Sequence, residues 1–165
     1  MAKPHIIIDG YNFIMRLYKI DWNQEDALLE ARERLIHQVI AYRGNKQMEI
    51  TIVFDGQDVK GITRRHRPKG IHVKFSKAPQ KADPMILKII HAARNPRNIT
   101  LVTSDRGLSR QAKAYGCRAE SVESFRDRIE AKPQPKSHGA EKKYNVNMSQ
   151  QELEEWLRLF EEGKE

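Results

Sequence analysis

The stretch HIIIDGYN (residues 5–12) places three isoleucines directly before an aspartate, a glycine, a tyrosine and an asparagine. A short apolar run bounded by turn residues is typical of a fully buried strand. Asp9 then stands at the carboxyl end of that strand, and Gly10 predicts that the backbone turns away there. A surface turn by itself explains Gly10 and Asn12, so the role of Asp9 depends on which residues end the other strands.

Strand-like and helix-like segments alternate over the first 130 residues. Four further strands are predicted, at 49–54, 71–75, 98–102 and 117–121. Four helices are predicted, at 23–42, 82–93, 105–115 and 122–129. Asn23 is the predicted cap of the first helix, and alternating polar residues mark 71–75 as edge-like. This order predicts an α/β fold, a three-layer Rossmann-like sandwich around a mainly parallel central sheet.

Aspartates recur where the predicted strands end. Asp9 follows the first strand, Asp55 the second and Asp105 the fourth, and Asp83 stands at the entry to the helix after the third. Each alone is explained by helix capping or turn chemistry. The carboxyl ends of parallel strands meet at one edge, however, so we expect the four side chains to converge there. Gathered carboxylates repel one another unless a cation neutralises them, and oxygen-only ligands suit Mg²⁺ or Mn²⁺.

A metal site of this kind supports hydrolysis of a phosphate ester, because the ion lowers the pKa of bound water and stabilises the leaving oxygen. Asn12, Ser104 and Arg106 stand beside the acids, where they either contact a phosphate or hold the local turns. The chain has neither a G-x-G-x-x-G motif nor a P-loop, so no small-molecule nucleotide cofactor is expected. Its six histidines show no metal-binding spacing.

The net charge of +8 is concentrated in residues 57–81, which carry eight lysines or arginines and one acid. Such a block attracts polyanions, because each cation that neutralises a phosphate releases condensed counterions. It equally suits a solvated loop. It lacks the apolar face of an interfacial helix, and no apolar run approaches the ~20 residues of a membrane helix, so no membrane partner is expected. The candidate nucleic-acid contacts in this block are Lys60, Arg64, Arg65, Arg67, Lys69 and Lys81.

At 165 residues the chain suits one domain and a tail. We predict a domain over 1–130, a basic, proline-containing linker over 131–148 and a helix over 149–165 that either packs back or docks a partner. Cys117 is the only cysteine, which excludes an intrachain disulfide. The first residues lack the pattern of a secretory signal, so a cytoplasmic location is expected.

Four motifs, DGYN, VFDG, KADPMI and TSDRGL, occur in this order and spacing. On them the chain resembles NYN-domain nucleases of the YacP type, within the PIN-like superfamily, over residues 5 to about 130. The resemblance implies a PIN-like fold and metal-dependent endoribonuclease activity. It matches Asp9, Asp83 and Asp105 to the metal-binding acids, with Asn12 and Asp55 in support. Bacterial relatives of this type include ribosome-associated enzymes that cut mRNA, which implies mRNA as substrate and the ribosome as a candidate partner.

The pattern departs from the family at one position. Many PIN-like nucleases carry a further acid shortly after the last aspartate, where this chain has Gly107. The resemblance therefore leaves one or two metal ions open. Two other functions remain alternatives: an RNA- or ribosome-binding protein whose acids are catalytically silent, and a nuclease directed at DNA.

Overall fold

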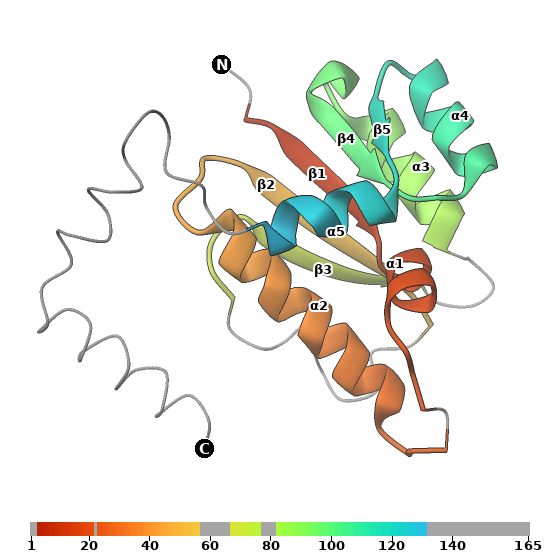
Figure 1. The fold of residues 1–165 in the computed structure, drawn as a ribbon. Helices are drawn as coiled ribbons and strands as arrows, with labels where there is room; N and C mark the ends of the chain where they lie inside the picture. The colour runs from red at the N-terminus through yellow and green to blue at the C-terminus, as the bar shows by residue number, and fades with distance from the viewer. Residues whose placement is uncertain (1–2, 22, 57–66, 77–81, 132–165) are drawn as a thin grey trace, which may run out of the picture. The chain divides into compact units, whose positions relative to one another are not determined.

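Five parallel strands form one sheet in the order β3-β2-β1-β4-β5 (Figure 1). The computed structural model describes residues 3–21, 23–56, 67–76 and 82–131. The strands are β1 (His5–Asp9), β2 (Glu49–Asp55), β3 (Ile71–Ser76), β4 (Ile99–Val102) and β5 (Arg118–Glu120). Every pairing is parallel, which confirms the predicted sheet, and β3 lies at an edge as its alternating residues indicated.

The order of the strands reverses next to β1. From β1 the chain moves outward through β2 to β3, then returns to the other side of β1 with β4 and continues to β5. Ile8 pairs with Val102, so the next residues along, Asp9 and Thr103, leave the sheet side by side. In open α/β sheets, ligands bind outside the carboxyl ends of the strands at such a reversal. The motif that begins at Asp9 therefore stands at the expected binding crevice.

Helices cover both faces of the sheet, which confirms the three-layer sandwich (Figure 1). The helices on one face are α1 (Gly10–Leu17), α2 (Ala27–Arg43) and α5 (Val122–Glu130). The helices on the other face are α3 (Ala82–Ala92) and α4 (Arg106–Ala114), with a short 3₁₀ turn at Pro96–Asn98 before β4. Because side chains alternate along a strand, Ile6 and Ile8 pack under the first set while Ile7 packs under the second.

Helix α1 was not predicted, and the surface turn considered for Gly10 is absent. Gly10 is instead the first residue of α1, and its φ is not positive. A Cβ atom on Gly10 would lie 2.5 Å from the ring of Phe54, so glycine is needed because α1 packs very closely on β2. Glycine serves both a tight turn and close packing, and the sequence does not show which of the two requires it. For this reason the sequence suggested a turn at Gly10.

The predicted cap Asn23 is also wrong. Helix α2 begins at Ala27, and Asp26 at its N-cap position makes no side-chain capping bond. The backbone N–H of Asn23 instead donates to Oδ1 of Asp21 at 3.1 Å. This local bond holds Asn23 in a turn, and the helix begins about one helical turn later than predicted.

By its internal contacts, the chain up to Glu130 forms one compact unit. The predicted linker at 131–148, apart from its first residue, and the predicted terminal helix at 149–165 lie outside the described residues. In the described part of the chain, no helix is both long enough and apolar enough to cross a membrane.

Candidate active site

Asp9 is a buried carboxylate at the end of the central strand. Its Oδ1 accepts the backbone N–H of Asn12 at 3.3 Å and so caps α1, and its Oδ2 accepts the hydroxyl of Thr103 at 3.1 Å. Only 5% of the residue is exposed. Burial, reinforced by the charges of Asp83 and Asp105, raises the pKa of Asp9 to about 6, while the two hydrogen bonds act to lower it.

Thr103 connects the two aspartates that follow adjacent strands. Its buried hydroxyl donates to Asp9 and accepts the backbone N–H of Asp105 at 3.1 Å. Asp105 in turn caps α4, because its Oδ1 accepts the N–H of Leu108 at 3.0 Å. The capping role considered for Asp105 is therefore real, Asp9 has the same role at α1, and the two capping bonds fix where each carboxylate lies. Sequence reasoning missed Thr103, whose only signal was its place just after a strand and two residues before Asp105.

The third and fourth acids have different surroundings. Asp83 lies half-buried in the first turn of α3, and its charge acts on Asp9. Asp55 instead accepts the hydroxyl of Ser76 through Oδ1 at 3.1 Å, and its backbone oxygen accepts from Arg32 at 2.8 Å. The charges that raise the pKa of Asp9 come from Asp83 and Asp105. The charges of three of the four predicted acids, Asp9, Asp83 and Asp105, therefore interact. Asp55 is instead hydrogen-bonded to Ser76 at the ends of β2 and β3.

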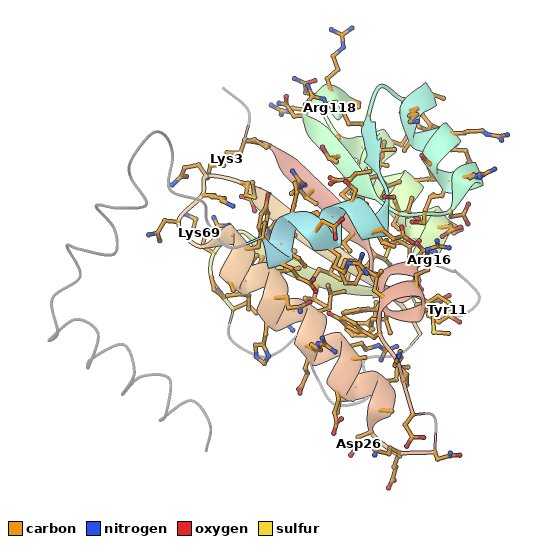
Figure 2. All side chains as sticks on the ribbon, in the orientation of Figure 1. Lys3, Tyr11, Arg16, Asp26, Lys69 and Arg118 are labelled. Atoms are coloured by element: carbon orange, nitrogen blue, oxygen red, sulfur yellow. The ribbon has the colours of Figure 1, made fainter. Side chains whose placement is uncertain are left out.

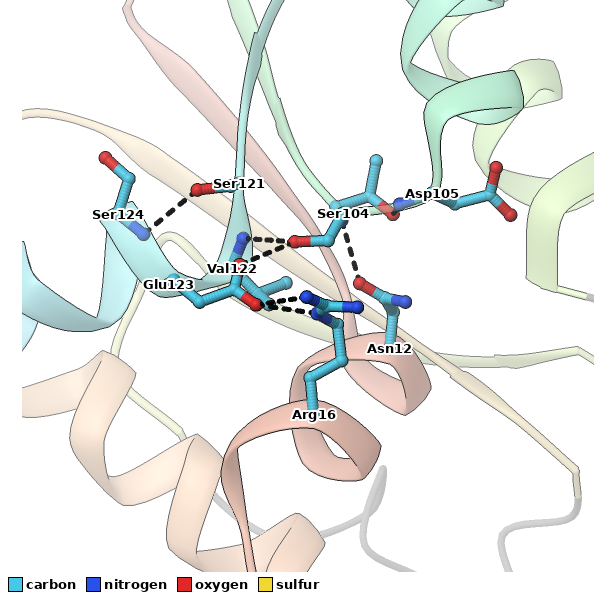
Figure 3. A network of polar contacts seen from close by, with 9 residues as sticks. Asn12, Arg16, Ser104, Asp105, Ser121, Val122, Glu123 and Ser124 are labelled. Carbon is cyan, nitrogen blue, oxygen red and sulfur yellow. Dashed lines mark hydrogen bonds and ion pairs between the residues drawn. The ribbon is translucent and has the colours of Figure 1, made fainter.

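A polar network joins α1 to the loop that carries Asp105 (Figure 3). The backbone N–H of Ser104 donates to Oδ1 of Asn12 at 2.8 Å, and its hydroxyl donates to Glu123 at 2.7 Å and accepts from Val122 at 3.1 Å. Glu123 then pairs with Arg16 on α1 at 2.6 Å. The hydrogen bond from Ser104, together with that from Arg16, lowers the pKa of Glu123 to about 2.

In this network Asn12 and Ser104 are hydrogen-bonded to each other, and contact of either residue with a phosphate stays a prediction. Arg16 and Glu123 were missed, because 107 residues separate them in the sequence and neither belongs to a recognisable motif. The network ties α1, which Asp9 caps, to the loop before Asp105. It therefore helps to set the separation of the two carboxylates.

The predicted basic residues that the structure describes lie in two different places. Arg106 is exposed in the first turn of α4, next to Asp105. Lys69 stands two residues before β3, at the amino end of the strands, and Figure 2 shows it beside Lys3 and far from Arg16. Arg67 is half-buried in the same segment. The remaining predicted contacts, Lys60, Arg64, Arg65 and Lys81, lie outside the described residues.

The carboxylates of Asp9, Asp83 and Asp105 are suitable ligands for a hard cation, but they do not form a complete metal-binding site. Within the described ranges, no three Asp, Glu, His or Cys side chains lie close enough together to hold a metal ion as they stand. Asp9, Asp83 and Asp105 nevertheless interact electrostatically and offer only oxygen donors. A divalent cation would relieve the penalty that burial imposes on ionised Asp9.

Comparisons with known proteins agree with this architecture. The family model described as "YacP-like NYN domain" matches residues 6–161. The uncharacterized protein YacP of Bacillus subtilis (strain 168) is 30% identical over 101 residues, which are 61% of this chain and 59% of YacP.

Two crystal structures of Rae1 (YacP) from Bacillus subtilis share the fold. One matches with a TM-score of 0.70 at 24% identity and covers 99% of this chain and 95% of Rae1. The other, of a mutant form of Rae1, matches with a TM-score of 0.62 at 25% identity and covers 76% of this chain and 74% of the mutant. The sheet order and both helical layers thus correspond to a PIN-like fold, and NYN domains are a nuclease family. The chain belongs to the YacP-like NYN domain family.

Proposed function

We propose that the protein is a metal-dependent endoribonuclease that hydrolyses RNA phosphodiester bonds. The observation that carries the proposal is the buried carboxylate of Asp9, whose pKa is raised to about 6 by burial and by two further carboxylates at the strand-order reversal. Strongly perturbed acids in such a position are typical of functional sites rather than of structural ones. Membership of a nuclease family supports the same reading.

In this proposal Asp9, Asp83 and Asp105 bind a Mg²⁺ or Mn²⁺ ion. When bound, the ion lowers the pKa of a water molecule and stabilises the negative charge on the leaving oxygen. Thr103 holds the Asp9 carboxylate in place through its hydroxyl. The side-chain oxygen of Asn12 accepts the backbone N–H of Ser104. In this proposal, the amide N–H groups of Asn12 then donate hydrogen bonds to a phosphate.

The substrate and setting that we propose are mRNA, the ribosome and the cytoplasm. They rest on the family resemblance and on the net charge of +8, which favours polyanionic partners. An RNA- or ribosome-binding protein without catalytic activity shares the same charge. Cleavage is what separates the two functions.

The test compares the parent with Asp9→Asn on two substrates. On naked RNA, the parent should cleave with Mg²⁺ or Mn²⁺, stop in EDTA and recover when the metal is restored. On translating ribosomes the metal concentration stays constant, because ribosomes themselves need Mg²⁺, and the inactive variant serves as the blank. Cleavage that persists in EDTA would exclude the metal, and absence of any product on either substrate would favour the binding protein.

Glu123 should act as a positioning residue for this reaction. Glu123→Ala removes the acceptor for Ser104 and the partner of Arg16, so we expect kcat to fall about tenfold with KM nearly unchanged. Glu123→Gln keeps an oxygen for Ser104 and should recover most of the rate. Glu120→Ala, which breaks an ion pair with Arg128 outside the network, is the matched control. Equal losses from the Glu120 and Glu123 alanine variants would contradict the positioning role.

A further inference from the structure

Helix α4 carries an exposed row of cations on one side. Its sequence, RGLSRQAKA, contains three basic residues and no acid. Arg106, Arg110 and Lys113 are four and three residues apart, a spacing that places them on one face, and all three are exposed. Leu108 and Ala112 on the opposite side are buried against the sheet.

The row is not neutralised by the part of the protein that the structure describes. The ion pairs found there use other cations, among them Arg16, Arg126 and Arg128. Like charges one turn apart repel slightly, and only Lys113, in the last turn, interacts favourably with the helix dipole, so the stability of the helix does not account for the row. Packing of α4 depends on Leu108 and Ala112, which leaves the three cations available for a ligand.

The row begins at the candidate active site. Asp105 caps α4, and Figure 3 shows it at the point where the helix ribbon starts. With a rise of 1.5 Å per residue, Arg106 and Lys113 are separated by about 10 Å along the helix axis. Successive phosphates of a stacked strand rise by about 3.4 Å, so the row spans roughly three of them.

We propose that Arg106, Arg110 and Lys113 bind consecutive phosphates of the RNA strand on one side of the bond that is cut. The inference rests on the proposed function. It identifies α4 as the surface along which the RNA sugar-phosphate backbone runs away from Asp9, Asp83 and Asp105. Lys69, which with Lys74 on the edge strand β3 is one of two exposed cations of the basic block among the described residues, lies instead at the amino end of the sheet. It is therefore poorly placed to hold a phosphate next to Asp9.

The experiment measures binding of a single-stranded RNA oligonucleotide as a function of salt, in the Asp9→Asn background so that no cleavage occurs. Arg110→Gln/Lys113→Gln removes two cations of the row that stand away from the acids. Lys3→Gln/Lys46→Gln removes two exposed cations that precede β1 and β2 at the amino end of the sheet. Thermal unfolding of each variant checks that the fold is unchanged.

The α4 variant should flatten the slope of log affinity against log salt by about 1.4, since each lost phosphate contact on a single strand accounts for about 0.7. The amino-end variant should leave the slope close to that of the parent. An unchanged slope in the α4 variant, or an equal change in both variants, would overturn the inference.

The outcome is separable from that of the proposed function. If the protein cleaves RNA but the α4 slope is unchanged, only the phosphate track fails. If the slope falls as expected but the parent with an intact Asp9 never cleaves RNA, the track stands and the catalytic proposal fails.

Discussion

Replacing Asp9 by asparagine is expected to abolish RNA cleavage and, at the same time, to stabilise the metal-free protein. Asparagine keeps an oxygen that can cap α1 but loses the negative charge that a cation requires. We expect cleavage to fall by at least about 10³-fold, equivalent to roughly 4 kcal/mol of transition-state stabilisation. Asp127→Asn, which alters an exposed aspartate on α5, is the matched control and should cleave like the parent.

The gain in stability follows from the raised pKa of Asp9. Its ordinary pKa is 3.8, and in the folded protein it is about 6. Between these values the folded state holds a proton that the unfolded chain has released, so the free energy of unfolding falls as pH rises. Two pKa units correspond to about 3 kcal/mol. Above pH 6, Asp9→Asn should therefore be more stable than the metal-free parent by up to that amount, and below pH 4 the difference should disappear.

Urea unfolding in EDTA across this pH range measures the effect. Adding Mg²⁺ or Mn²⁺ at neutral pH should reverse the order, since a ligand that binds only the folded parent stabilises it by mass action. A parent that gains no stability from either metal would argue against binding at Asp9. A difference between the two proteins that does not change with pH would show that the Asp9 proton is not its source.

Thr103→Val is expected to have the second largest effect. Valine matches threonine in shape but removes the hydroxyl that donates to Asp9 and accepts from the N–H of Asp105. The buried carboxylate of Asp9 and the partly buried N–H of Asp105 each lose a partner, which should cost about 2–4 kcal/mol of stability. Because this hydroxyl lowers the pKa of Asp9, its loss should raise that pKa further and move the acidic limb of the pH–rate profile to higher pH.

The rate of Thr103→Val should also fall by about 10²-fold at neutral pH, because neither carboxylate is then held in position. Thr103→Ser keeps the hydroxyl and loses only a methyl group. It should retain the parental pH profile with a cost of about 1 kcal/mol in stability. A valine variant with the same pH profile as the serine variant would show that the hydroxyl does not control the protonation of Asp9.

Most of the fold was predictable because its signals are local. Short apolar runs marked the strands, and the edge position of β3 followed from its exposed His72 and Lys74. The two errors were also local. Gly10 is a residue typical of turns, but here it allows α1 to pack closely on Phe54. The carboxylate of Asp21 holds Asn23 in a turn before α2 begins.

By itself, the sequence determined which acids arrive at the carboxyl edge of the sheet, because the end of a strand is fixed by where its apolar run stops. It placed Asp9 and Asp105 there correctly. Only the tertiary structure decided how they are held. The hydroxyl of Thr103, which lies 94 residues after Asp9 in the sequence, donates to Asp9. Arg16 pairs with Glu123, which lies 107 residues after it. The pKa of Asp9 likewise depends on burial and on charges from α3 and α4, which arise only when distant segments pack together.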